Sequence, residues 1–294
     1  MTSDDCPDPL HLAFDPCTPW GAKEHYFHFL HGYLLPGLSL ALETGARRVQ
    51  FENCGPLMQP RIAEACALLS LDLASPLTSP LIGDTPPQAK VSVPRWDRLL
   101  LRFDAPPHPS YVLQAYRAGT WQVRQRLLDA SRRETSASGS LVRWQETDVI
   151  VFERSEEHPF YRSQPMARTP GYGRGRRHLE NSREIAAALC ASGLRAQALD
   201  LGALSLADQI MACHHARAVI GIRGAEFASL VWMQPGSAAI MLADPVDREN
   251  HGTRSLAAIY DVRFSSPEVP AARVAFAPAR AVTLIREAIG PRAE

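Results

Sequence analysis

The chain has 294 residues, and its 31 Lys and Arg side chains are balanced by 31 Asp and Glu side chains, for a formal net charge of zero. With 46% hydrophobic and 21% charged residues, the composition is typical of a globular protein and excludes collagen-like, disordered and coiled-coil chains. The length suffices for about two domains of ordinary size. A neutral chain has no overall attraction to nucleic acid or anionic lipid, so any anion site has to be local.

The sequence gives no membrane or secretion signal. It contains no apolar run near the roughly 18 residues that a membrane-spanning helix needs, and it begins with the acidic stretch MTSDDCPDPL, where a signal peptide would be basic and then apolar. Six cysteines are scattered without a CxxC pair, which favours a reducing compartment. We expect a cytoplasmic protein, with a peripheral place at the inner face of the membrane as an alternative.

The N-terminal part predicts mixed helices and strands. Apolar and aromatic residues at 20–42 predict a helix with a break at Pro36, because proline cannot continue the helical hydrogen bonds. The other expected elements are strands at 48–51 and 98–103, and helices at 60–69 and 120–130. Segments rich in Pro, Ser, Gly and charge predict loops at 102–109 and 131–140. We place the domain boundary at the second loop, which gives domains 1–140 and 141–294.

The C-terminal part alternates strands and helices regularly. The expected strands are 149–152, 195–199, 218–222 and 238–242, and the expected helices between them are 181–192, a helix beginning after Ser205, and 225–233. Asn181 with Glu184 matches a capping box, and Gly193 matches a C-cap. A last helix near 278–290 is a candidate to pack back onto the N-terminal part. Strands separated by such helices form right-handed βαβ units, so we expect an α/β protein of two Rossmann-like domains facing a central cleft.

The segment VIGIRGAEFAS at 219–229 is a candidate anion site. An apolar strand ends before Arg223 and Gly224, and a helix begins near Ala225. Backbone N–H groups at a helix start, beside a guanidinium, favour a phosphate. The alternative is a plain strand-to-helix turn with a solvated arginine.

The stretch from Arg154 to Arg177 is a second candidate, because it is rich in arginine and glycine and follows the first strand of the C-terminal part. Such a loop can fold over a pyrophosphate by charge-assisted hydrogen bonds. The alternative is a solvated basic loop. No aromatic interleaving accompanies the arginines, so we expect no nucleic-acid partner.

His25, His28 and His31 lie three residues apart, so on a helix their directions drift by about 60° per step and they do not form a metal trio. One of them could act as a general base, and a packed or surface histidine is the alternative. No DxD stretch is present, so a carboxylate-held metal–nucleotide site is not supported. We expect no metal and no cofactor.

Several ordered motifs resemble the bacterial branch of glycosyltransferase family 61. They are VIVFER ending at Arg154, N-x-x-E-I from Asn181, S-x-x-D-Q-I from Ser205, A-x-V-I-G-x-x-G-A ending at Ala225, the W-M-x-P-G turn at 232–236, and HYFHFLHGYLLPGL, which places His28 on the family histidine. The resemblance implies a GT-B fold, an inverting, metal-independent transfer from a nucleotide sugar, and a role in surface polysaccharide assembly. The implied partners are the donor and a glycan or lipid-linked acceptor, and a homodimer is a further candidate.

The resemblance also implies roles for particular residues. Two candidates for the catalytic base are His28, taken first, and Glu226, with a carboxylate of the N-terminal half as a further alternative. Donor and phosphate binding is assigned to Arg154, Arg177, Gln209, Arg223, Gly224, Ala225 and Ser229. The family usually has His-Gly-Ala where this chain has Arg223-Gly224-Ala225, and Asn where it has Ser229. A non-catalytic homologue that binds a nucleotide or glycan, or serves as a partner subunit, is therefore the alternative function.

Overall fold

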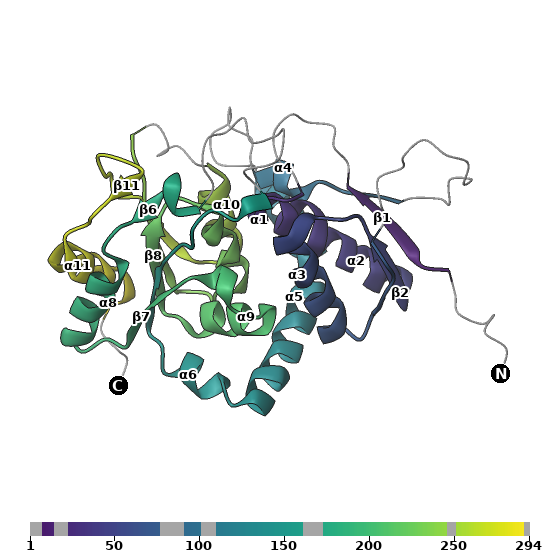
Figure 1. Ribbon diagram of the computed structural model, residues 1–294, viewed down its shortest axis with the longest axis horizontal. Coiled ribbons are helices and arrows are strands. Elements are labelled where there is room, and N and C mark those ends of the chain that lie inside the picture. Colours follow the sequence, from purple (N-terminus) through teal and green to yellow (C-terminus); the bar gives the residue numbers. More distant parts are fainter. Residues whose placement is uncertain are drawn as a thin grey trace.

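The computed structural model contains two parallel β-sheets side by side along the long axis of the molecule, each flanked by helices (Figure 1). It describes residues 8–14, 23–76, 91–100, 110–160, 173–245 and 251–290. The first sheet is built from the N-terminal part of the chain and the second from the C-terminal part. The expected α/β class with two Rossmann-like units is confirmed.

The first sheet has the strand order β3-β2-β1-β4, and each neighbouring pair is parallel. Its strands are β1 (Leu10–Phe14), β2 (Arg48–Phe51), β3 (Asp72–Leu73) and β4 (Val91–Val93). Its helices are α1 (Tyr26–Phe29), α2 (Leu35–Thr44), α3 (Gly55–Leu68) and α4 (Trp96–Leu100). On β2, Val49 and Phe51 are fully buried and alternate with partly exposed neighbours, as expected for a strand with one packed face.

The second sheet has the order β10-β9-β8-β5-β7, again parallel throughout. Its strands are β5 (Val149–Phe152), β7 (Ala196–Leu199), β8 (Ala218–Ile222), β9 (Ala238–Leu242) and β10 (Arg263–Ser265). All residues of β5, β8 and β9 are buried. Such unbroken apolar runs are typical of parallel strands covered on both faces.

Helices and short segments complete the C-terminal part. They are α6 (Leu141–Gln145), η2 (Gly173–Gly175), α8 (Ser182–Ala191), η3 (Leu201–Ala203), α9 (Leu206–His215), η4 (Ala225–Trp232), α10 (His251–Ile259) and α11 (Pro278–Ile289), with a small parallel pair, β6 (His178–Leu179) and β11 (Arg273–Val274). The segment η4 is a 3-10 helix, whereas an ordinary helix was expected there. The candidate packing of the last helix on the N-terminal part is wrong, because α11 packs on α8, β8 and β9.

The expected loop at 131–140 is wrong for most of its length. The helix α5 (Ser110–Ser138) runs through it and packs on α2 from the first half and on α9 from the second (Figure 1). Only at Gly139, with φ of 80°, does the chain leave the helix. The division of the chain into domains near residue 140 stays a prediction, and the expected loop at 102–109 lies outside the described residues.

Two further expectations in the first half need correction. The expected strand at 98–103 is helical where it is described, since α4 extends to Leu100. In the helix expected at 20–42, the irregularity comes before Pro36: residues Leu30–Leu34 form a π-helical turn, η1, and Pro36 lies in the first turn of α2. The helix is continuous here, since the Leu35 N–H donates to the Leu30 carbonyl, so the wider π-helical turn directly precedes the residue that has no N–H to donate.

The helix α8 begins after Asn181 as expected, but not through a capping box. The Asn181 side chain makes no capping bond; its Nδ2 donates to the Phe276 carbonyl and its Oδ1 accepts from the Phe276 N–H, both at 2.9 Å. At the other end, Gly193 has φ of 89° and ends the helix as expected. Ser205 caps α9, accepting from the Asp208 N–H.

Candidate functional site

Two arginines follow neighbouring strands at the carboxyl edge of the second sheet. Arg154 stands two residues after β5, and Arg223 comes directly after β8, which pairs in parallel with β5. Gly224 follows, with η4 beginning at Ala225. A Cβ atom at Gly224 would lie 2.6 Å from Cζ of Arg154 and closer still to its Nη2. Glycine at 224 therefore permits the close approach of the Arg154 guanidinium, which a side chain would displace.

The Arg154 guanidinium is a clamp between two segments. Its Nη1 donates to the Arg177 carbonyl at 3.1 Å, and its Nη2 donates to the Arg223 carbonyl at 3.3 Å. Nη2 also pairs with Oε2 of Glu226 at 2.5 Å. With both side chains mostly buried, the arginine ties the 173–177 segment to the turn before η4. Arg154 thus positions the expected anion site, and Arg177 joins it through its main chain.

The second part of the site lies on the first half. Nδ1 of His28, on α1, lies 2.7 Å from Oδ2 of Asp97, on α4. Asp97 also accepts from Arg95, through Nε at 2.8 Å and Nη2 at 2.7 Å. Burial alone would raise the pKa of Asp97, but the hydrogen bonds from Arg95 and His28 outweigh it and lower the pKa to about 2. Asp97 is therefore an ionised carboxylate inside the protein.

Local features hold this second part in place. A Cβ at Gly32, in the π-helical turn one turn beyond His28, would lie 2.6 Å from Cγ of Asp97, so the glycine makes room for the carboxylate. The Arg95 guanidinium lies over the ring of Phe14, at the end of β1, with 4.1 Å from its Cζ to the ring centroid. Arg95 itself follows β4 by two residues. The Asp97 group therefore lies near the carboxyl edge of the first sheet.

Contacts between α1, η1 and η4 bring the two parts together. Nε2 of His31 lies 3.0 Å from the Ala228 carbonyl, and Tyr26 donates to Oε1 of Gln209 at 3.1 Å. His25 lies between the parts: burial, followed by the charges of His28 and Arg176, lowers its pKa to about 4. The segment with His25, His28 and His31 (the histidine segment) thus packs against the part of the second half that carries Arg176 and η4.

The structure places the sequence-derived candidates unequally. Arg154, Arg177, Arg223, Gly224, Ala225 and Glu226 lie together at the turn between β8 and η4. Gln209 is buried and joins the halves through Tyr26, and Ser229 is 1% exposed, beside Tyr26 and Cys213. Ser229 therefore faces the interior. The basic-loop residues Arg162 and Arg168 lie outside the described residues.

Sequence reasoning missed Asp97 and Arg95, although a carboxylate of the N-terminal half was left open as a base. The signal available was the Arg-Trp-Asp sequence after a short strand. It was hidden because residues 98–103 resembled a strand, whereas Asp97 stands in the first turn of a helix.

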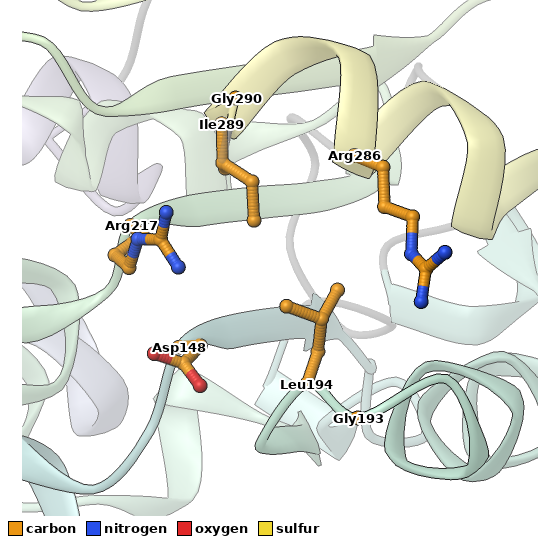
Figure 2. A pocket seen from close by; sticks show the side chains of 7 residues that line it. All are labelled: Asp148, Gly193, Leu194, Arg217, Arg286, Ile289 and Gly290. Carbon is orange, nitrogen blue, oxygen red and sulfur yellow. The ribbon is translucent and has the colours of Figure 1, made fainter. Parts of the chain in front are cut away.

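A cavity of about 400 Å³ lies elsewhere, at the opposite edge of the second sheet. Figure 2 shows its lining: Asp148 and Arg217 stand at the starts of β5 and β8, and Leu194 and Ile289 point toward each other across the space. Ligands of open parallel sheets bind outside the carboxyl ends of the strands. The cavity is at the wrong end of β5 and β8 to belong to the candidate site.

A family model for glycosyltransferase 61 matches residues 26–240, most of the chain. The chain belongs to the glycosyltransferase 61 family. The match begins at α1 and ends within β9, so it includes both the His28–Asp97 pair and the Arg154 clamp. The activity of this glycosyltransferase family requires a sugar donor and an acceptor. No curated protein matches the chain.

Two absences concern only the part of the chain that the structure describes. There, no helix is long and apolar enough to cross a membrane. Within the same residues, no group of three or more His, Cys, Asp or Glu side chains is placed to hold a metal ion.

Proposed function

We propose that this chain is an inverting glycosyltransferase of GT-B arrangement that moves a sugar from a nucleotide-activated donor to a hydroxyl group of a glycan or lipid-linked acceptor. The observation that carries the proposal is the packing of α1, which bears the Asp97-bonded His28, against η4, which begins at the arginine-bearing turn after β8. The arginines can bind a diphosphate, and His28 can accept the proton of a hydroxyl group. We place the activity in surface polysaccharide biosynthesis, on the cytoplasmic side of the membrane.

On the donor side, the proposed leaving group is a nucleoside diphosphate. Arg223 and the N–H groups of Gly224 and Ala225 stabilise the charge that develops on its oxygen, with Arg177 as an auxiliary. Arg154 acts through the turn, since its guanidinium already donates to two carbonyls and pairs with Glu226. These cations supply the electrostatic stabilisation that a metal ion provides in other enzymes, so the proposed reaction is metal-independent.

On the acceptor side, we assign the base to His28. Its Nε2 takes the proton of the acceptor hydroxyl while that oxygen bonds to the anomeric carbon. The bond from the anomeric carbon to the diphosphate oxygen breaks on the opposite face of the sugar, which inverts the configuration. Glu226 is the weaker candidate because Arg154 already holds its carboxylate.

The test is turnover of a panel of nucleotide sugars, measured as nucleoside diphosphate release with and without acceptor, on the full chain. We expect release that survives a chelator, and a large loss of kcat in His28→Ala with nucleotide affinity retained. His11→Ala is the matched control, since His11 is a buried histidine on β1. Wild-type turnover in His28→Ala would remove His28 as the base, and turnover restored only by divalent ions would refute metal independence.

Arg223 favours a second candidate, a non-catalytic homologue that binds a nucleotide or glycan, because the resembling family has His at this position. Arg223→His separates the two. A chain that binds nucleoside diphosphate without turnover as Arg, and gains turnover as His, would support the binding module. Turnover by the chain with Arg223 in place, unchanged or higher in Arg223→His, would support the enzyme with Arg as a tolerated substitute.

A further inference from the structure

A histidine acts as a base through one nitrogen only when the other nitrogen carries the proton. A neutral imidazole exchanges between two tautomers, and the hydrogen bond made by one nitrogen decides which of them prevails. For His28, that bond is the contact of Nδ1 with Oδ2 of Asp97 at 2.7 Å. It is the one hydrogen bond that His28 makes within the described residues.

Asp97 is built to accept rather than donate. Its side chain is 1% exposed, and Arg95, 3% exposed, donates to both of its oxygens. Guanidinium and carboxylate so paired are charged, and a carboxylate has no proton to give. Nδ1 of His28 must then be the donor, which leaves the lone pair on Nε2.

The surroundings fix the carboxylate in this orientation. Gly32 leaves space on the helix for Asp97, because a side chain there would meet its Cγ at 2.6 Å. The Arg95 guanidinium in turn lies over the Phe14 ring while it donates to Asp97. Glycine, aromatic ring and arginine together hold one oxygen of Asp97 toward His28. A carboxylate placed only to balance Arg95 would not need this third contact.

We propose that Asp97, held by Arg95, is the positioning residue that fixes the proton of His28 on Nδ1 and so presents Nε2 to the acceptor hydroxyl. This inference rests on the proposed function for the identity of the acceptor but not for the tautomer. Asp97 touches no reacting atom. Its effect reaches the reaction through the orientation and protonation of one imidazole.

The first experiment needs no variant at the site. The ¹⁵N spectrum of the full chain, labelled at histidine and recorded with the imidazole neutral, reports which ring nitrogen carries the proton. The His28 signal is identified by its disappearance in His28→Gln. We expect the Nδ1–H form. An Nε2–H form, or an even mixture of the two, would overturn the proposal whatever the activity.

The second experiment is Asp97→Asn, which keeps the size of the side chain but can donate. We expect the Nδ1–H form to be lost and kcat to fall by about 10²–10⁴, as when the same exchange fixes the wrong tautomer in a Ser-His-Asp triad, with nucleoside diphosphate affinity unchanged. The matched control is Asp148→Asn, since Asp148 is a buried carboxylate that accepts from both Nε and Nη2 of Arg195, at the far end of β5. It should leave the His28 spectrum and kcat unchanged.

The two proposals fail in different ways. If Asp97→Asn folds and keeps both the tautomer and kcat, Asp97 is only the partner of Arg95 and the positioning role is wrong. If Asp97→Asn fails to fold, the wild-type spectrum still decides. If the Nδ1–H form is present but His28→Ala retains full turnover, the tautomer inference stands and the choice of His28 as the base is wrong.

Discussion

Gly224→Ala tests the Arg154 clamp directly. The added methyl group would lie 2.6 Å from Cζ of Arg154 and closer to its Nη2, so the guanidinium has to leave its place. The backbone itself is not the obstacle: at φ of −178° and ψ of −179° it is extended, and alanine can adopt it. The substitution thus removes the contacts of Arg154 with Arg177, Arg223 and Glu226, and the new methyl also meets the Glu226 carboxylate.

The magnitude follows from what the displaced guanidinium loses. A methyl forced into a packed site costs about 1–3 kcal/mol. Hydrogen bonds to a charged group are each worth roughly 1.5–3 kcal/mol when buried, but the three contacts are not additive and the arginine can recover water on leaving. Its side chain is 11% exposed and that of Glu226 is 19% exposed, so screening is modest. We expect a net loss of about 2 kcal/mol in the free energy of unfolding.

The assay is urea unfolding followed by circular dichroism, in a double-mutant cycle. Gly175→Ala is the control, because a Cβ at Gly175, in η2, meets nothing within 4 Å. In the Arg154→Ala background only the Glu226 carboxylate, itself released from its ion pair, still lies near the new methyl, so Gly224→Ala should cost less there than in the wild type. An equal cost in both backgrounds would refute the clamp, as would a cost for Gly175→Ala that matches Gly224→Ala.

Three other perturbations have defined outcomes. Measured by calorimetry, Arg223→Ala should weaken the binding of a nucleoside diphosphate by about 1.5–3 kcal/mol and leave the binding of the nucleoside alone unchanged. An equal loss of affinity for both ligands would contradict a contact with the phosphates. Burial lowers the pKa of His31 to about 4, so the unfolded chain binds a proton at a higher pH than the folded chain does. The free energy of unfolding should therefore decline as the pH falls from about 6.5 toward 4. In His31→Gln this decline, measured by chemical unfolding, should be flatter. A parallel slope in the variant would show that His31 does not contribute. Asn181→Asp should destabilise, since Asp keeps the acceptor for the Phe276 N–H but cannot donate to the Phe276 carbonyl; a stability equal to wild type would support the N-cap role instead.

The strands of the second sheet could be predicted because their physical signal is local. Residues 149–152, 218–222 and 238–242 are short apolar runs, and each proved to be a strand buried on both faces. The helix starts between them also carry local chemistry, as at Ser205, whose hydroxyl accepts from the N–H three residues on. Signals of this kind need no knowledge of the rest of the fold.

The polar stretch at 131–140 was misjudged because composition does not reveal where a polar side chain finds its partner. Ser131 and Thr135 are 0% and 1% exposed, on the face of α5 that packs inward. The Thr135 hydroxyl donates to the carbonyl of Ser131, four residues earlier, so its burial leaves no unmet hydrogen bond. A helix whose backbone accepts from a hydroxyl group can thus bury a residue that otherwise marks a loop, although the Ser131 hydroxyl has no hydrogen-bond partner among the described residues.

Only one of the two parts of the candidate site could be predicted from the sequence, because the interacting residues of the other part lie far apart along the chain. The turn from Arg223 to Glu226 is contiguous, and its chemistry could be predicted from strand, glycine and helix in order. The pair of His28 and Asp97 joins residues 69 positions apart, and nothing near His28 indicates that a carboxylate is its neighbour. Gly32 is the exception in hindsight, since a glycine inside a buried helix leaves a space that another element has to fill.

The interface between the halves decides how the two parts of the site act together. His31 lies on the same helical segment as His28, and both of its ring nitrogens are engaged, one with Tyr116 and the other with the Ala228 carbonyl of η4. Each of these contacts is buried, so His31 cannot move without leaving a polar group unpaired in the core. The offset between the histidine segment and the β8–η4 turn is therefore set by packed, hydrogen-bonded side chains. A substitution at His31 should therefore change the alignment of the proposed base, His28, with the proposed donor site, although His31 has no part in the proposed reaction itself.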